Sequence, residues 1–260
     1  MSGTTGVPGR PVWHDRTVIT DGTRAALSRR AALNNAGWCD AVCRAHGLSP
    51  QYDGEHLWTS AVRTPPLYPD AVTLDAGVAA PSVLRSLDTG SPGCSVKDSF
   101  AALDLAGAGF EVLFEAQWIH RPAGATVPAA DPSAPQWSEV RDAPELAAWE
   151  AAWSGGESTG LFPPSLLGGG TDFLAGRAGG RIVAGAVAHT AAGVVGVSNL
   201  FARSGSDPDA AWAGALSAIA ARRPGLPVVG YEHGPDLDAA LRHGFTATGP
   251  LRVWLRTAGG

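Results

Sequence analysis

The stretch that decides the fold is residues 227–256, PVVGYEHGPDLDAALRHGFTATGPLRVWLR. The apolar, β-branched run 228–231 follows a proline and predicts a short buried strand. Pro235 then opens a helix whose apolar residues recur at three- and four-residue spacing. Gly244 stands where a left-handed residue would end that helix, and Phe245 follows as its apolar anchor. Alternation over 251–256 predicts a final, half-exposed strand.

An earlier stretch repeats this order of elements. Residues 94–98 predict a strand, 99–108 a helix, and Gly109 and Phe110 lead into a strand over 111–121. The two stretches agree in order and, to within one residue, in spacing. This agreement predicts an internal duplication, with two related units in one chain.

The front of the first unit predicts one long helix and several short elements. The helix begins at Asp21, with Asp21 or Thr23 as its cap, and is expected to break at Gly37. Three shorter elements should follow, namely strands over 57–62 and 71–74 and a helix over 80–87.

A change in composition divides the chain. Residues 122–136, PAGATVPAADPSAPQ, are rich in Pro and Ala and offer little that can pack, which is typical of a linker. We therefore predict an N-terminal domain over 1–125, a linker over 126–136 and a C-terminal domain over 137–260.

The second unit contains a complete series of elements before the opening stretch. Asp142 is predicted to cap a helix over 143–153. The other elements expected are strands over 137–140, 171–177, 181–190 and 194–202 and a long helix over 208–223.

Strand, helix, three-strand meander, helix, strand, helix, strand is an order that resembles the GNAT acyltransferases. The resemblance covers residues 137–256 in full, whereas the first half resembles only the later part of the pattern. It implies an α/β (α+β) fold of two GNAT-like units, with mixed central sheets flanked by helices and a degenerate N-terminal domain. It also implies an N-acyltransferase that moves an acyl group from acetyl-CoA or another acyl-CoA to a small amine or amino-acid-like substrate.

The resemblance places the CoA pyrophosphate at the start of the helix 208–223, where free N–H groups and the helix dipole attract an anion. The family's loop reads Arg/Gln-x-x-Gly-x-Gly/Ala. Here Arg203 and Gly205 match in part, Ser206 stands where the first glycine belongs, and Pro208 removes an N–H donor. The implied cofactor contacts are Ser198, Asn199, Leu200, Arg203, Gly205 and Ser206. The alternative is an ordinary helix start capped by acidic side chains.

The catalytic residues typical of the family do not carry over. The strand 194–202 lacks the expected glutamate, and the last helix lacks the expected tyrosine. The remaining candidates are Tyr231, Glu232 and His233, with Glu232 as general base and His233 as its partner or substitute. The alternative is that these polar groups only solvate a strand end.

Four further residues are candidate substrate contacts in a cleft between the halves: Asp98, Glu115, Trp118 and Trp153. The alternative assigns them to a salt bridge and to packed indoles. A second function is therefore considered, in which a GNAT-fold protein without CoA binds a small molecule, or catalyses another reaction, in this cleft.

Composition argues against several function classes. The net charge of -5 and the pI near 5.8 argue against nucleic acid, and no apolar run is long enough to span a membrane. Three cysteines do not make a disulfide framework, and Cys39 and Cys43 beside His46 favour core packing over a metal site. Without a visible signal peptide, we expect a cytoplasmic monomer or homodimer that handles a small molecule and holds no metal.

Overall fold

The computed structural model describes residues 20–126 and 134–257. Its helices are α1 (Asp21–Ala45), α2 (Ala80–Arg85), η1 (Ala106–Ala108), α3 (Ala143–Ser154), η2 (Pro164–Leu166), α4 (Pro208–Arg222) and α5 (Gly234–Arg242). Its strands are β1 (Gln51–Asp53), β2 (Leu57–Thr59), β3 (Ala71–Thr73), β4 (Ser95–Asp98), β5 (Phe110–Arg121), β6 (Gln136–Glu139), β7 (Thr171–Ala178), β8 (Arg181–Ala191), β9 (Val194–Ala202), β10 (Val228–Glu232) and β11 (Thr246–Arg256). The predicted α/β class is confirmed.

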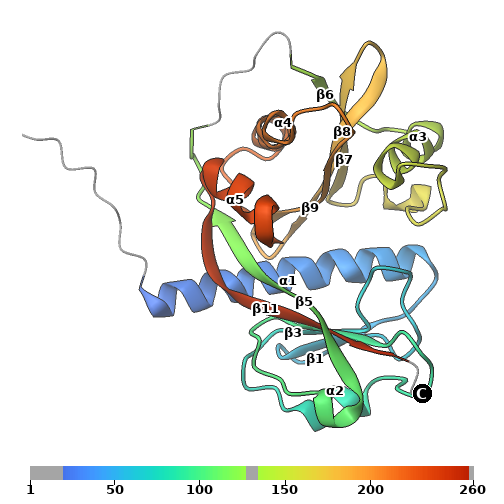
Figure 1. The fold of residues 1–260 in the computed structure, drawn as a ribbon, viewed down its shortest axis with the longest axis vertical. Helices are drawn as coiled ribbons and strands as arrows, with labels where there is room; N and C mark the ends of the chain where they lie inside the picture. Colours follow the sequence, from blue (N-terminus) through green and yellow to red (C-terminus); the bar gives the residue numbers. More distant parts are fainter. Residues whose placement is uncertain (1–19, 127–133, 258–260) are drawn as a thin grey trace, which may run out of the picture.

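The strands form a single mixed sheet in the order β1-β2-β3-β4-β11-β5-β10-β9-β8-β7-β6, instead of the two sheets expected. At its centre the two halves of the chain exchange strands. β11 of the second half pairs with β4 and β5 of the first half, and β5 of the first half pairs with β10 of the second. Figure 1 shows the long β5 and β11 running together between the two ends of the molecule. The predicted boundary at 126–136 therefore separates two segments that share a sheet. The division into two domains and their common origin stay predictions.

Helix α1 lies across the molecule and contacts strands from both halves (Figure 1). Thr20 caps it by accepting a hydrogen bond from the N–H of Thr23. The predicted break at Gly37 is wrong, since the helix is continuous. Gly37 serves close approach instead, because a Cβ there would come within 3.1 Å of the Ala191 Cβ on β8.

A buried amide fixes α1 to the β8–β9 hairpin. The Asn34 side chain donates to the carbonyls of His189, Ala191 and Val194 at 2.9–3.3 Å. Gly196 on β9 makes room for it, since a Cβ at this position would lie 1.8 Å from the Asn34 oxygen. The helix is thereby held directly over β9 and β10.

Apolar cores fill both faces of the sheet. The core on the α1 and α3 face includes Trp38, Trp149 and Phe173, whereas the core under α4 and α5 includes Trp212 and Phe245. The predicted left-handed cap of α5 is present, with Gly244 at φ +84° and Phe245 buried behind it. No helix among the described residues has the length and apolar content needed to cross a membrane.

One predicted helix is absent. Residues 99–101 form a turn, residues 102–105 have no regular secondary structure, and only η1 remains of the expected helix over 99–108. The Asp98 carboxylate accepts hydrogen bonds from the N–H groups of Phe100 and Leu103, and Ala101 has a left-handed backbone with φ +50°. These local bonds give the chain an alternative to the helix.

Candidate active site between β9 and β10

The adjacent parallel strands β9 and β10 part soon after they meet. Only Val195 with Val228 and Gly196 with Val229 are paired. Beyond these positions β9 continues as far as Ala202 beside β8, while β10 pairs with β5 on its other side. The two strands therefore diverge toward their carboxyl ends, beneath α1.

A β-bulge lies on β9 at this opening. The register with β8 shifts between the pairs Gly185–Phe201 and Val187–Ser198, so that Asn199 and Leu200 face no partner on β8. Asn199 has φ +51°, a left-handed conformation that is uncommon outside glycine. The bulge leaves backbone groups of Asn199 and Leu200 outside the described sheet pairing.

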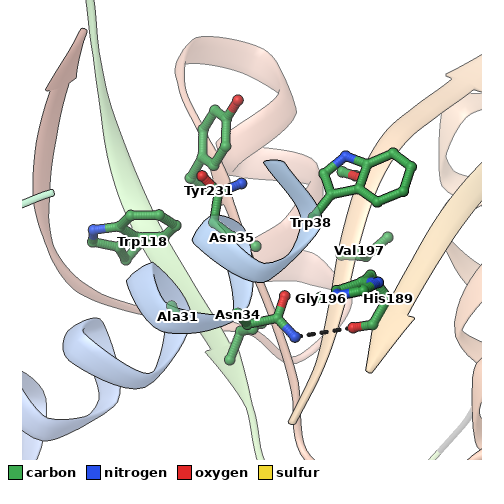
Figure 2. Close-up of a pocket in the computed structure, with 12 residues that line it drawn as sticks. Ala31, Asn34, Asn35, Trp38, Trp118, His189, Gly196, Val197 and Tyr231 are labelled. Carbon is green, nitrogen blue, oxygen red and sulfur yellow. Dashed lines mark hydrogen bonds between the residues drawn. The ribbon is translucent and has the colours of Figure 1, made fainter. Parts of the chain in front are cut away.

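A narrow cavity of about 10 Å³ begins where the strands part. That volume suits about one water molecule or one thin group. Its walls are Gly196 and Ser198 of β9, Gly230 and Tyr231 of β10, and Asn35 and Trp38 of α1. Figure 2 shows Asn34, Asn35 and Trp38 descending from α1 toward the strands, with Trp118 and Tyr231 to one side and His189 to the other.

A wider cavity of about 90 Å³ continues from the narrow one and shares Asn35, Trp38, Ser198 and Tyr231 with it. It reaches into the first half of the chain, where Lys97 of β4 and Tyr68 line it. The two cavities together form a pocket built from both halves of the sequence.

Lys97 lies against the ring of Tyr231 in this pocket. Its Nζ is 4.1 Å from the ring centroid and donates to Asn35 Oδ1 at 2.9 Å. Phe114 stacks beside Tyr231 with ring centroids 6.5 Å apart, and Trp118 meets it edge-on at 5.6 Å. Tyr231 is thus fixed by aromatic rings and a cation, with its side chain on the α1 face of the sheet.

Glu232 ends β10 opposite Gln117 of β5. Because side chains alternate along a strand, its carboxyl group lies on the face opposite to Tyr231. Burial, and to a smaller extent the negative charge of Asp236, raises the pKa of Glu232 to about 8. His233 occupies the N-cap position of α5, with its ring 5.7 Å from Phe114. The strand end thus carries a carboxyl group that titrates near neutral pH.

The predicted pyrophosphate loop has its own internal partners. Ser206 N–H bonds to the carbonyl of Arg203, and Gly205 has φ +85°. Asp207 caps α4 by accepting from the N–H of Asp209, and the Asp209 carboxylate bonds to Arg242 and His243 at the end of α5. Hydrogen bonds from Arg242, the largest contribution, and from His243 lower the pKa of Asp209, which stays anionic.

Three of the four predicted substrate contacts lie elsewhere. Asp98 is buried and caps the turn after β4, Glu115 pairs with Arg252 at 2.6 Å, and Trp153 packs against Phe162. Trp118 does line the narrow cavity, where its indole N–H donates to the Ser99 carbonyl.

The buried thiols and imidazole near the pocket are structural. Burial raises the pKa of Cys39 to about 11 and that of Cys43 to about 12, so both remain protonated thiols. His189 bonds to Thr171 at 2.9 Å, and burial lowers its pKa.

Sequence reasoning missed the contributions of Asn35, Trp38, Tyr68 and Lys97. A signal in the sequence was available for Lys97 alone. Lys97 is the sole lysine of the sequence and stands inside a run predicted to be a buried strand. A charged residue at such a position is rare unless it has a ligand or a partner.

Comparison with known proteins shows the class of fold. The chain resembles a GCN5-related N-acetyltransferase from Kribbella flavida, with a TM-score of 0.61 and 16% identity over 88% of this chain and 96% of that one. It also resembles a GNAT-family protein from Novosphingobium aromaticivorans (TM-score 0.53, 16% identity, 87% and 99%) and a conserved protein of unknown function from Staphylococcus epidermidis (TM-score 0.56, 10% identity, 81% and 95%). No protein-family model and no curated protein matches the chain by sequence.

The described chain therefore has the fold of the GNAT acetyltransferases. The likeness extends over nearly the whole length of these structures, so both halves of the chain belong to it.

Proposed function

We propose that this protein is an N-acyltransferase that moves an acyl group from an acyl-CoA to a small amine. The main observation behind this proposal is that β9 and β10 diverge after Gly196 and Val229. The divergence lies beside the bulge at Asn199, and α1 covers the pocket that forms there. A slot between parallel strands with a β-bulge on its wall suits a thioester, because backbone amides at such a wall can stabilise a developing oxyanion.

The chain's own groups have distinct roles in this proposal. An acyl-CoA would supply a thioester, which is attacked by an amine without a covalent enzyme intermediate. Backbone N–H groups near Ser198 and Asn199 would donate to the carbonyl oxygen, and α1 would exclude bulk water from the pocket. A water molecule, or His233 at the start of α5, would take the proton of the amine, because the Glu232 carboxyl group lies on the face of the sheet opposite to the pocket.

The loop 203–209 fits the diphosphate part of such a donor poorly. Pro208 has no N–H, and the N–H of Asp209 is already bonded to Asp207. Positive charge at this end of β9 comes instead from Arg181 and Arg203, which line an open groove of about 410 Å³. We therefore assign the thioester to the slot and make no assignment of the phosphates to the helix start.

Binding of the donor tests the proposal directly. Calorimetry and thermal unfolding with acetyl-CoA, longer acyl-CoAs and free CoA should show saturable binding and a rise in Tm, because a ligand of the native state alone stabilises it. Replacing Gly205 with Leu separates the loop from the slot. If the phosphates lie away from the loop, this variant keeps the wild-type dissociation constant. The absence of binding at millimolar concentration would refute the acyl-CoA proposal.

Two observations favour a second function. Groups of the loop 203–209 are already hydrogen-bonded within the protein, and the pocket is formed by both halves of the chain. In this alternative the protein binds a small molecule without CoA, or catalyses a reaction other than acyl transfer. The same titration discriminates between the two, since the alternative predicts no response to any acyl-CoA and a response to the pocket's own ligand.

A further inference from the structure

The wider cavity contains a buried cation that acyl transfer does not require. The Lys97 side chain belongs to a residue that is only 4% exposed. Within residues 20–126 and 134–257, no carboxylate oxygen lies within 4.0 Å of its Nζ. The adjacent Asp98 is turned away and bonded to Leu103. Asn35 and the Tyr231 ring offset part of the cost of burying this charge, but neither neutralises it.

A second buried group points to the same missing partner. Tyr68 lines this cavity and is 9% exposed, and its hydroxyl has no hydrogen-bond partner among the residues that the structure describes. The turn that carries it is fixed, because Asp70 accepts from the N–H of Thr64 and the Thr64 hydroxyl donates to the Tyr68 carbonyl. A buried donor held in place without an acceptor is unfavourable unless something else binds it.

We propose that this cavity binds the carboxylate of a small organic acid. The Lys97 ammonium and the Tyr68 hydroxyl would each donate to it, two donors for the two oxygens of a carboxylate. A phosphate would bring more oxygens and about two charges to a site with one cation. Trp38, Leu67 and Leu161 form apolar walls, which suit a hydrocarbon body beyond the carboxylate.

The position of the cavity suggests the substrate class. Tyr231 and Ser198 belong to both cavities, so a ligand whose carboxylate lies at Lys97 extends toward the parting of β9 and β10. A short molecule with a carboxylate at one end and an amine at the other would place the amine at the slot. Its role as acyl acceptor rests on the proposed acyl transfer, whereas its binding does not.

Binding of matched acids and amides to the full-length protein, without any CoA, tests the inference. The probes are L-leucine, L-phenylalanine and 3-phenylpropanoate, each beside its carboxamide, with inorganic phosphate as a competing anion. We expect saturable binding of at least one acid, with its amide at least about ten-fold weaker because the charge-assisted hydrogen bonds are lost. Since the chain has one lysine, lysine labelled with ¹³C at Cε gives a single side-chain signal, which should shift on binding.

Two variants distinguish a ligand site from a structural role. Tyr68→Phe removes a hydroxyl that bonds to none of the described residues, so Tm should stay or rise while acid binding weakens about ten-fold. Lys97→Met should weaken it about a hundred-fold and also keep or raise Tm, because an unneutralised buried charge is removed. Arg252→Met, which removes a cation outside the cavity, is the control and should bind as the wild type does.

Several outcomes would overturn the inference. These are no saturable binding of any acid up to about 20 mM, equal binding of acid and amide, tighter binding of phosphate, or unchanged acid binding by Tyr68→Phe. Acyl-CoA binding together with any of these would refute the carboxylate site alone. Carboxylate binding without acyl-CoA binding would refute the proposed acyl transfer alone.

Discussion

Two pairs of parallel strands in this sheet part in the same way, yet the positions beyond the parting differ. In the second half β9 and β10 share two paired positions, and in the first half β3 and β4 also share two, Ala71 with Val96 and Val72 with Lys97. Beyond them, the Thr73 hydroxyl oxygen on β3 accepts a hydrogen bond from the N–H of Ser99 at 2.8 Å. At the equivalent place β9 has Val197, whose side chain cannot hydrogen-bond across the gap, and β10 faces it with Gly230, which has no side chain.

The comparison shows that backbone pairing alone does not make a site. The same strand divergence is bridged where a short polar side chain reaches across it, and it stays open where valine faces glycine. The open divergence is also the one under α1, whose Asn34 and Asn35 face the strands (Figure 2). The side chains just beyond the last paired residues therefore decide which half holds the candidate active site.

Filling the open divergence should have the largest effect. A Cβ on Gly230 would lie 3.0 Å from the Val197 carbonyl oxygen, so Gly230→Val should press into the slot. We expect acyl-CoA binding to weaken at least about a hundred-fold and the free energy of unfolding to fall by about 1–3 kcal/mol from overpacking. Calorimetry and thermal unfolding measure the two effects.

The milder variant Gly230→Ala shows whether a loss of binding comes from a filled slot or from unfolding of the protein. It should stay folded and weaken binding less than Gly230→Val does. Wild-type affinity in a folded Gly230→Val protein would show that the thioester does not lie between these strands.

Removing the hydrogen bond that links β3 and β4 beyond their paired residues should lower stability and leave acyl-CoA binding unchanged. Thr73→Val leaves the buried N–H of Ser99 without its partner, at a cost of about 1–3 kcal/mol in the free energy of unfolding. Chemical denaturation measures this loss, and acyl-CoA affinity should match the wild type. A variant that loses both would mean that the first half also contributes to the donor site.

The pH dependence of stability should reveal Glu232. Its pKa is raised in the folded state to about 8 from an ordinary value of 4.5. Its contribution to stability is therefore complete below pH 4.5 and is lost as the pH rises to 8. Glu232→Gln should be more stable than the wild type by about 1 kcal/mol or more at pH 9, with little difference at pH 4. Parallel stability curves from pH 4 to 9 would contradict the buried carboxyl group.

Much of the fold could be predicted because its signals are local. Proline and glycine punctuation around residues 227–256 and the Asp142 cap each gave the correct element. The absence of the helix over 99–108 could not be predicted, because the hydrogen bonds that the Asp98 carboxylate accepts from Phe100 and Leu103 leave no trace in the hydrophobic periodicity. The break at Gly37 was wrong because tertiary contact with β8 outweighs the propensity of one glycine.

The candidate site was less predictable because it is built across the chain. Of the candidate site residues chosen from the sequence, Ser198, Trp118 and Tyr231 line the narrow cavity, and their roles stay predictions. Asn35 and Tyr68 come from segments whose approach depends on the exchange of β5 and β11. No pattern within either segment encodes that exchange, so the wall formed by the first half was missed.

The smallest expected effect on stability concerns the left-handed backbone conformation found near each divergence. Each has a non-glycine residue in the left-handed region nearby, Asn199 at φ +51° in the open one and Ala101 at φ +50° after β4. Alanine avoids this region more strongly than asparagine, so Ala101→Gly should raise the free energy of unfolding by about 1 kcal/mol and Asn199→Gly by about half as much at most. Denaturant titrations of both variants measure the difference. An equal gain at Asn199 would mean that the surrounding strands, rather than the preference of asparagine, impose the bulge. Strain imposed in that way is typical of a binding or catalytic backbone.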